Sequence, residues 1–84
     1  MHEVLLERGA EKDLNRLTPV VFQRVITAIR GLKTSTRPAG SKKLTGSPGG
    51  WRLRVGDYRI IYEIDDRAKC VRILRVRHRR EVYR

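Results

Sequence analysis

One segment, WRLRVGDYRIIYEI at residues 51–64, predicts two strands joined by a tight turn. Its first five residues alternate apolar side chains with Arg52 and Arg54, which is the period of two expected of a half-buried strand. Gly56 and Asp57 are residue types that favour a tight turn, and the apolar-rich run after them predicts the second strand. The segment therefore indicates a β-hairpin with one apolar and one cationic face.

A third strand is expected after this hairpin. Residues 65–69 supply a polar turn, and residues 70–78 are rich in Val, Ile and Leu, so the three strands should form an antiparallel meander. One face of this sheet is expected to cover the helices, and it carries Trp51, Leu53, Tyr58, Ile60 and Tyr62. The opposite face is expected to carry arginines.

The N-terminal part of the chain predicts a short strand and two helices. Residues 2–6 contain the apolar side chains of the strand, and residues 10–17 repeat apolar side chains at helical spacing. A second helix is expected over residues 19–32, because Thr18 is a common N-cap type and Pro19 suits the first helical position. Two such helices joined by a short turn form a helical hairpin that must bury its apolar side.

A long surface loop is expected between the helices and the meander. Residues 34–50 hold two of the three prolines and four of the seven glycines. The element order is then β-α-α-β-β-β. It predicts a single α+β domain over residues 1–84, in which an antiparallel sheet has the helical hairpin packed on one face.

The charge of the chain points to a polyanionic partner. The 84 residues contain 20 Lys and Arg and 9 Asp and Glu, which gives a formal net charge of +11. Fifteen of these cations are arginine, the residue best suited to bidentate contact with phosphate. Much of the excess lies in residues 51–84, so we expect a nucleic-acid contact in the C-terminal half.

Several classes of site are excluded by composition. Cys70 is the only cysteine, which excludes an internal disulfide and a cysteine-based zinc site. His2 and His78 are too few to bind a metal without carboxylates, so we expect no metal and no other cofactor. No apolar run approaches the ~20 residues of a membrane span, and residues 1–7 lack the pattern of a secretory signal. A cytoplasmic protein that does not contact membranes is therefore expected.

The arginines of the meander are expected to form one cluster. Arg52 and Arg54 project from one side of a strand, and the turn brings Arg59 back beside them. The third strand adds Arg75, Arg77 and Arg79. Like charges held this close repel one another, which favours an anionic ligand that completes the cluster. The alternative is a solvated basic surface without a specific ligand.

Two motifs resemble a known family. Residues 52–62, RLRVGDYRIIY, and residues 78–84, HRREVYR, are similar at this separation to the RelE branch of the RelE/ParE toxin superfamily. The resemblance covers nearly the whole chain and implies a RelE-like fold. It also implies a ribosome-dependent endoribonuclease that cleaves mRNA in the ribosomal A site. The partners implied are the ribosome, mRNA and a cognate acidic antitoxin similar to RelB.

The same resemblance assigns roles to individual residues. The catalytic candidates are Arg54, Arg59, Arg79 and Tyr83. The RNA-binding candidates are Arg52, Arg37, Lys42 and Lys43 from the resemblance, and Arg75 and Arg77 from their place in the third strand.

The chemistry of RNA cleavage is compatible with these residue types. Attack of a 2′-hydroxyl on the adjacent phosphate needs a base, donors that hold the extra negative charge, and an acid for the leaving 5′-oxygen. We expect Arg59 and Arg79 to hold the phosphate, Arg54 to position the hydroxyl and Arg52 to orient the backbone. Tyr83 is the candidate base, because neighbouring cations stabilise a phenolate.

Other interpretations remain open from the sequence. His78 is the alternative acid or base, although its position in the strand alternation favours a structural role. The whole chain is also compatible with a ParE-like toxin that inhibits DNA gyrase and has no nuclease activity. A third interpretation is a nucleic-acid-binding module that does not cleave its ligand.

Overall fold

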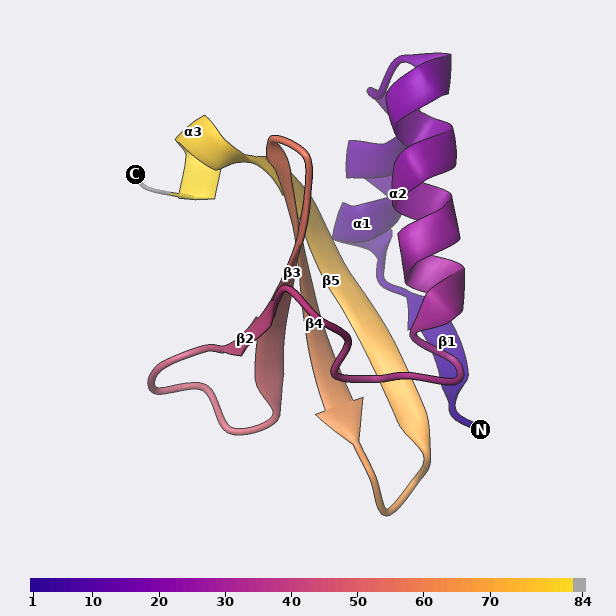
Figure 1. The fold of residues 1–84 in the computed structure, drawn as a ribbon, viewed down its shortest axis with the longest axis vertical. Helices are drawn as coiled ribbons and strands as arrows, with labels where there is room; N and C mark the ends of the chain where they lie inside the picture. Colours follow the sequence, from indigo (N-terminus) through magenta and orange to yellow (C-terminus); the bar gives the residue numbers. More distant parts are fainter. Residues whose placement is uncertain (83–84) are drawn as a thin grey trace.

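A computed structural model describes residues 1–82 of the chain (Figure 1). Its elements in chain order are β1 (Glu3–Leu6), α1 (Arg8–Asn15), α2 (Pro19–Gly31), β2 (Ser41–Lys43), β3 (Gly50–Val55), β4 (Tyr58–Asp65), β5 (Cys70–His78) and α3 (Arg79–Val82). The predicted α+β class, the helical hairpin and the three-strand meander are confirmed.

The strands form one mostly antiparallel sheet in the order β1-β5-β4-β3-β2. The sequence analysis makes no prediction for the pairing of the N-terminal strand, and β1 pairs with β5 in parallel. The two strands stand at opposite ends of the chain, so no hairpin turn joins them or requires them to be antiparallel. The remaining neighbours, β2–β3, β3–β4 and β4–β5, are antiparallel.

A fifth strand lies inside the region that the sequence predicts as a loop. Residues 41–43 form β2 and pair with residues 51–53 of β3 at the edge of the sheet. A turn prepares this pairing, because both the backbone N–H and the hydroxyl of Ser41 donate to the Pro38 carbonyl, at 3.0 and 2.7 Å. The strand is only three residues long, which is too short for an alternation of apolar and polar residues to reveal it.

The second helix starts where the sequence predicts. Thr18 is the N-cap residue with an extended backbone, and Pro19 takes the first helical position. The threonine side chain forms no capping hydrogen bond. Instead, the Thr18 carbonyl accepts the Phe22 N–H at 2.8 Å.

The core lies between the sheet and the two long helices, which cover the same face (Figure 1). The predicted apolar face of the meander is confirmed, since Leu53, Ile60 and Tyr62 are buried there and Trp51 and Tyr58 pack against them. From the helices, the buried side chains include Ala10, Leu14, Val25, Ile29 and Leu32. None of the helices within residues 1–82 has both the length and the apolar content needed to cross a membrane.

Strand β5 changes its pattern of burial halfway along its length. Val71, Ile73 and Val76 are buried, so the interval between core residues grows from two to three. The register explains this change, because Tyr62 lies opposite Ile73 whereas Ile61 lies opposite Arg75. Leu74 therefore has no partner in β4, which defines a β-bulge.

Candidate functional site

A cationic pocket lies on the sheet where β2, β3 and β4 run side by side. It has a volume of about 290 Å³, and it is lined by Gly40, Lys42, Arg52, Arg54 and Arg59. Within residues 1–82, no acidic side chain lines it, and none of its four cations forms an ion pair with a carboxylate. We call these four cations with Gly40 the cationic pocket.

The strand register brings the cations of the pocket together. Lys42 lies directly opposite Arg52 across β2 and β3, and Arg54 lies directly opposite Arg59 across β3 and β4. Residues opposite one another in neighbouring strands share a face, with Cβ atoms about 5 Å apart. The sequence prediction that Arg52, Arg54 and Arg59 lie together is therefore confirmed.

Arg59 is the most deeply placed cation of the pocket. Only 8% of the residue is exposed, and its Nη1 donates to the Tyr58 carbonyl at 3.2 Å. Burying a guanidinium without an opposite charge is costly. The remaining donors can compensate for this cost by binding an anion in the pocket.

Arg54 is held by the hairpin turn. Its Nε donates to the Gly56 carbonyl at 3.3 Å, and Gly56 has a φ of +59°. That left-handed conformation favours glycine, so the turn chemistry predicted from Gly56 and Asp57 is confirmed. The guanidinium is thereby oriented along the strand, beside Arg59.

The C-terminal candidates need a correction. Arg79 does not belong to the third strand, because β5 ends at His78 and Arg79 begins the short helix α3. The ladder stops there since the partner strand starts at Tyr58, opposite His78. The Arg79 N–H instead donates to the Asp57 carbonyl at 2.7 Å, which attaches the start of α3 to the β3–β4 turn. In Figure 1, α3 lies on the side of the sheet away from α1 and α2.

His78 lies on the face opposite to the arginines. It is paired with Tyr58, and the two rings meet edge to face at 5.3 Å between centroids. Its Nδ1 accepts the Arg80 N–H at 3.3 Å. Arg77, the residue before it, lies opposite Arg59. The fourth catalytic candidate, Tyr83, lies outside the described residues.

Four of the predicted RNA-binding cations do not line the cationic pocket, and one of them, Arg77, lines a separate pocket with Asp13 and His78. Arg37 pairs with Asp66 at 2.9 Å and lies over the Trp51 ring at 5.2 Å. Lys43 lies opposite Trp51, on the other face of β2 from Lys42. Arg75 is held by a carboxylate of α1, described next. Of the arginines of the meander, which were predicted to form one cluster, Arg75 is therefore held apart by its ion pair with Asp13.

Asp13, which no sequence pattern singles out as functional, binds the third strand from α1. Its Oδ2 accepts hydrogen bonds from Arg75 Nε and the Val76 N–H, both at 2.9 Å, and its Oδ1 accepts from Arg75 Nη2 at 3.1 Å. Burial alone raises the pKa of Asp13. The hydrogen bonds from Arg75 and Val76, with the charges of Arg75 and Arg77, outweigh burial and hold that pKa below its ordinary value. Nothing in the local sequence indicates this partnership.

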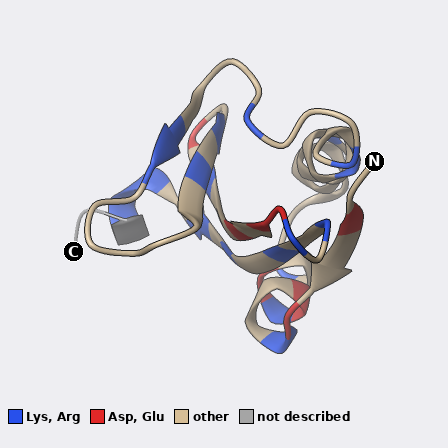
Figure 2. Cartoon of the chain, turned by 90° about the horizontal axis from the view of Figure 1, so that it is seen from below, with Lys and Arg blue, Asp and Glu red and all other residues tan. Residues whose placement is uncertain are grey.

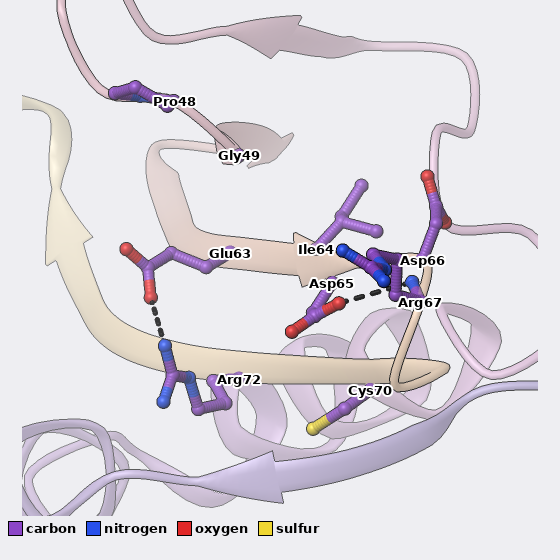
Figure 3. A pocket seen from close by; sticks show the side chains of 9 residues that line it. All are labelled: Pro48, Gly49, Glu63, Ile64, Asp65, Asp66, Arg67, Cys70 and Arg72. Carbon is purple, nitrogen blue, oxygen red and sulfur yellow. Dashed lines mark hydrogen bonds and ion pairs between the residues drawn. The ribbon is translucent and has the colours of Figure 1, made fainter.

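A second pocket lies at the other end of β4 and differs in charge (Figure 3). It has a volume of about 310 Å³, and its lining includes Glu63, Asp65, Arg67, Cys70 and Arg72. Its lining carries both signs of charge: Arg72 Nη2 donates to Glu63 at 2.8 Å, and the backbone N–H of Arg67 donates to the Asp65 carboxylate at 3.1 Å. Cys70 is half-buried there. This pocket lacks the uncompensated charge of the cationic pocket.

The distribution of charged residues over the chain agrees with this difference between the two pockets. Figure 2 shows Lys and Arg gathered where β2, β3 and the C-terminal segment lie. Most of the acidic positions lie elsewhere along the chain. Among residues 1–82, no three His, Cys, Asp or Glu side chains are grouped so that they could hold a metal ion.

Comparison with known proteins defines the class. A family model, described as the ParE toxin of the type II toxin-antitoxin system parDE, matches residues 4–83. The chain therefore belongs to the ParE/RelE toxin superfamily of type II toxin–antitoxin systems. The resemblance inferred from the two sequence motifs is confirmed.

Individual relatives agree with this membership. Toxin RelG of Mycobacterium tuberculosis (strain ATCC 25618 / H37Rv) is 36% identical over 76 residues, which are 89% of this chain and 87% of RelG. The toxin–antitoxin complex RelBE2 of Mycobacterium tuberculosis contains a chain with a TM-score of 0.80 and 32% identity, over 92% of this chain and 96% of that one. The RelE–RelB complex of Pyrococcus horikoshii OT3 contains a chain with a TM-score of 0.83 and 26% identity, over 93% of this chain and 94% of that one.

Proposed function

We propose that this chain is a ribosome-dependent endoribonuclease that cleaves mRNA in the ribosomal A site and so inhibits translation. One observation supports the proposal above the others. Four cations from three strands line one pocket, and the most buried of them, Arg59, has no carboxylate partner within residues 1–82. A phosphodiester supplies the charge that such a pocket lacks.

The proposed reaction is an intramolecular transesterification of a phosphodiester in the RNA backbone. The 2′-oxygen of a nucleotide attacks the adjacent phosphorus, the bond from phosphorus to the 5′-oxygen breaks, and a 2′,3′-cyclic phosphate and a 5′-hydroxyl end result. The proton leaves the 2′-hydroxyl for a base, and the leaving 5′-oxygen takes up a proton. The extra negative charge in the transition state resides on the phosphate oxygens, where arginine donors stabilise it.

We assign roles to the residues on this basis. Arg59 and Arg79 hold the phosphate, Arg54 positions the 2′-hydroxyl, and Arg52 and Lys42 orient the backbone of the message. The register supports the grouping of Arg54 with Arg59. The hydrogen bond from the Arg79 N–H to Asp57 supports a place for Arg79 beside the hairpin turn.

The proposed base is Tyr83, since arginine is protonated at all relevant pH values and cannot accept the proton. The alternative base, His78, belongs to the opposite face of β5 and its Nδ1 accepts the Arg80 N–H. That placement favours Tyr83. It also favours a structural role for His78 against the Tyr58 ring.

The openness of the site supports dependence on the ribosome. Arg54 and Lys42 are exposed, and the lining residues come only from three neighbouring strands and from Gly40. Such a site binds phosphate but does not align a flexible RNA strand for in-line attack. We therefore expect slow cleavage of free RNA, with the ribosome holding the message in the reactive geometry.

We infer that an acidic antitoxin is the partner of this chain. The similar structures from Mycobacterium tuberculosis and Pyrococcus horikoshii are toxin–antitoxin complexes. A net charge of +11 favours association with an acidic chain. Such a partner would neutralise the toxin by covering the cationic pocket.

A second candidate function follows from the name of the matching family model, which is that of the parDE toxin. A ParE-like toxin would inhibit DNA gyrase without cleaving RNA. The two functions predict different damage in the cell, so one experiment separates them.

The decisive experiment is expression of the chain without an antitoxin, followed by primer-extension mapping of mRNA ends. We expect new ends inside translated codons, and we expect them to disappear when ribosomes are removed from a purified reaction. The Arg59→Ala variant, expressed at the same level, is the control. Unchanged mRNA ends together with gyrase-linked DNA breaks would support the ParE-like function instead. If the chain binds RNA but produces neither new mRNA ends nor DNA breaks, it is a nucleic-acid-binding module that does not cleave its ligand.

A further inference from the structure

The bulge at Leu74 decides which side chains of β5 share the face of the cationic pocket. Val71 and Ile73 are buried in the core, so uninterrupted alternation would direct residues 75 and 77 into the core as well. The extra residue reverses this pattern. Val76 becomes the next core residue, and Arg77 lies opposite Arg59 on the other face.

Asp13 holds this bulge from α1. The edge of β5 is covered by β1 only as far as Ile73, opposite Leu6, and Glu7 adds one hydrogen bond to the Ile73 carbonyl. Beyond that point, the Val76 N–H donates to Asp13 Oδ2 at 2.9 Å. Arg75 grips the same carboxylate through Nε and Nη2. The carboxylate thus binds the backbone and the side chain of the two residues that follow the bulge.

Gly9 makes this close approach possible. It lies one helical turn before Asp13, so both residues face β5. A Cβ atom at Gly9 would lie 2.8 Å from the Arg75 Cδ and 3.2 Å from the Leu74 carbonyl oxygen. Helix α1 therefore contacts the bulge directly, through a glycine that leaves room and a carboxylate that binds.

We propose that Asp13 is a positioning residue for RNA binding, which acts by holding the bulge at Leu74 so that Arg77 lies opposite Arg59, on the face of the sheet that carries the cationic pocket. This inference rests on the proposed function. Asp13 does not line the cationic pocket; together with Arg77 it lines a separate pocket. Its effect passes through the register of β5, which also sets where Arg79 leaves the strand.

The charge of Asp13 makes the inference testable. A purely electrostatic role and a positioning role predict opposite changes in RNA affinity when the carboxylate is removed. If the carboxylate acted on RNA only through its negative charge, Asp13→Asn would make the chain more cationic and tighten RNA binding. If it positions Arg77, the same substitution weakens binding although the net charge has risen. Glu63→Gln is the matched control, since Glu63 pairs with another arginine of β5, Arg72, at 2.8 Å and before the bulge.

The experiment measures binding of a short, fully 2′-O-methylated RNA that cannot be cleaved. We expect Arg77→Ala to weaken binding about fivefold, as loss of one hydrogen-bonded contact does. Asp13→Asn should weaken it by a similar factor, and the double variant should lose no more than Arg77→Ala alone. Glu63→Gln should bind as well as the wild type or better. Wild-type or tighter binding by Asp13→Asn, or losses that multiply in the double variant, would overturn the inference.

A second measurement does not depend on RNA. Nuclear Overhauser contacts between the side-chain protons of Arg77 and Arg59 should be present in the wild type and in Glu63→Gln, and absent in Asp13→Asn. If Asp13→Asn does not fold, Gly9→Ala takes its place, because it displaces Arg75 without a change of charge. Contacts that persist in the variant overturn the inference. If the wild type cuts no message but these contacts and the binding losses behave as expected, the nuclease proposal fails and the role of Asp13 stands.

Discussion

Lys42 and Lys43 are neighbours in the sequence but lie on opposite faces of β2. Lys42 is opposite Arg52 and lines the cationic pocket, whereas Lys43 is opposite Trp51. Both side chains are exposed and carry the same charge. The two lysines therefore distinguish the proposed phosphate site from the rest of the basic surface.

We expect Lys42→Ala to weaken RNA binding more than Lys43→Ala. Loss of one phosphate contact lowers the slope of log affinity against log salt concentration by about 0.7 for single-stranded RNA. Lys43→Ala should leave that slope nearly unchanged. Fluorescence anisotropy with the 2′-O-methylated RNA, over a range of salt concentrations, gives both slopes. Equal effects of the two substitutions would indicate a solvated basic surface without a specific site.

Arg59 should be the cation whose loss costs most in cleavage. Removing one donor to the transition state typically costs about 2.7–4 kcal/mol, so Arg59→Ala should slow cleavage of ribosome-bound message by about 10²–10³-fold. Arg59→Lys keeps the charge but loses the paired donors, and we expect it to recover only part of the rate. Single-turnover cleavage on programmed ribosomes measures this. Arg67→Ala, in the exposed β4–β5 turn of Figure 3, should cut at the wild-type rate.

The two candidate bases can be separated by a pair of phenylalanine variants. His78→Phe keeps an aromatic ring against Tyr58, so cleavage should stay within about threefold of the wild type. Tyr83→Phe removes the proposed base, and loss of general base catalysis typically costs about 10²–10⁴-fold. Cleavage rates of the two variants at one pH decide the assignment. A large loss in His78→Phe with a small loss in Tyr83→Phe would exchange the two roles.

Asp13 should make the stability of the fold depend on acid. Its folded-state pKa lies below the ordinary value of 3.8, so its contribution is present at pH values above that and is lost as the pH falls through the folded pKa. We expect Asp13→Asn to lower the free energy of unfolding by about 2 kcal/mol at pH 7, as for hydrogen bonds to a charged group. Urea unfolding of both proteins should show this difference shrinking below about pH 4. A difference that is the same at pH 7 and pH 3 would contradict an ionised Asp13.

Tyr62 links the core to the segment that leads into the cationic pocket. The ring is fully buried, burial raises the pKa of its hydroxyl, and Oη donates to the Thr36 carbonyl at 2.8 Å. Tyr62→Phe should cost about 1 kcal/mol of unfolding free energy through the lost hydrogen bond. Urea unfolding measures the loss. Tyr58→Phe is the control, and an equal loss there would mean that the bond to Thr36 contributes nothing particular.

Local sequence patterns are sufficient to predict those parts of the site whose geometry depends on residues close together in the chain. Arg52 and Arg54 share a face because alternate residues of a strand do, and the turn at Gly56 returns Arg59 to the same place. The start of α2 at Pro19 follows from backbone geometry in the same way. These features depend on contacts within a few residues, so the residue types alone indicate them.

Patterns were insufficient where a contact joins distant segments. The parallel pairing of β1 with β5 involves residues far apart in the sequence. The end of β5 is set by its partner, so Arg79 was assigned to a strand that the structure ends at His78. Arg75 carries the same side chain as Arg77, but the approach of Asp13 from α1 gives it a different role.

The class of fold, the arginine-rich hairpin and the family could be predicted from residue order, because each follows from periodicity, turn chemistry or two contiguous motifs. The set of cations that share a pocket could not be predicted in this way. Lys42 belongs to it and Lys43 does not, and Arg77 lies beside Arg59 only because β5 contains a bulge. The physical reason is that strand register depends on hydrogen bonds between remote segments, and a shift of one residue reverses the face of every side chain after it.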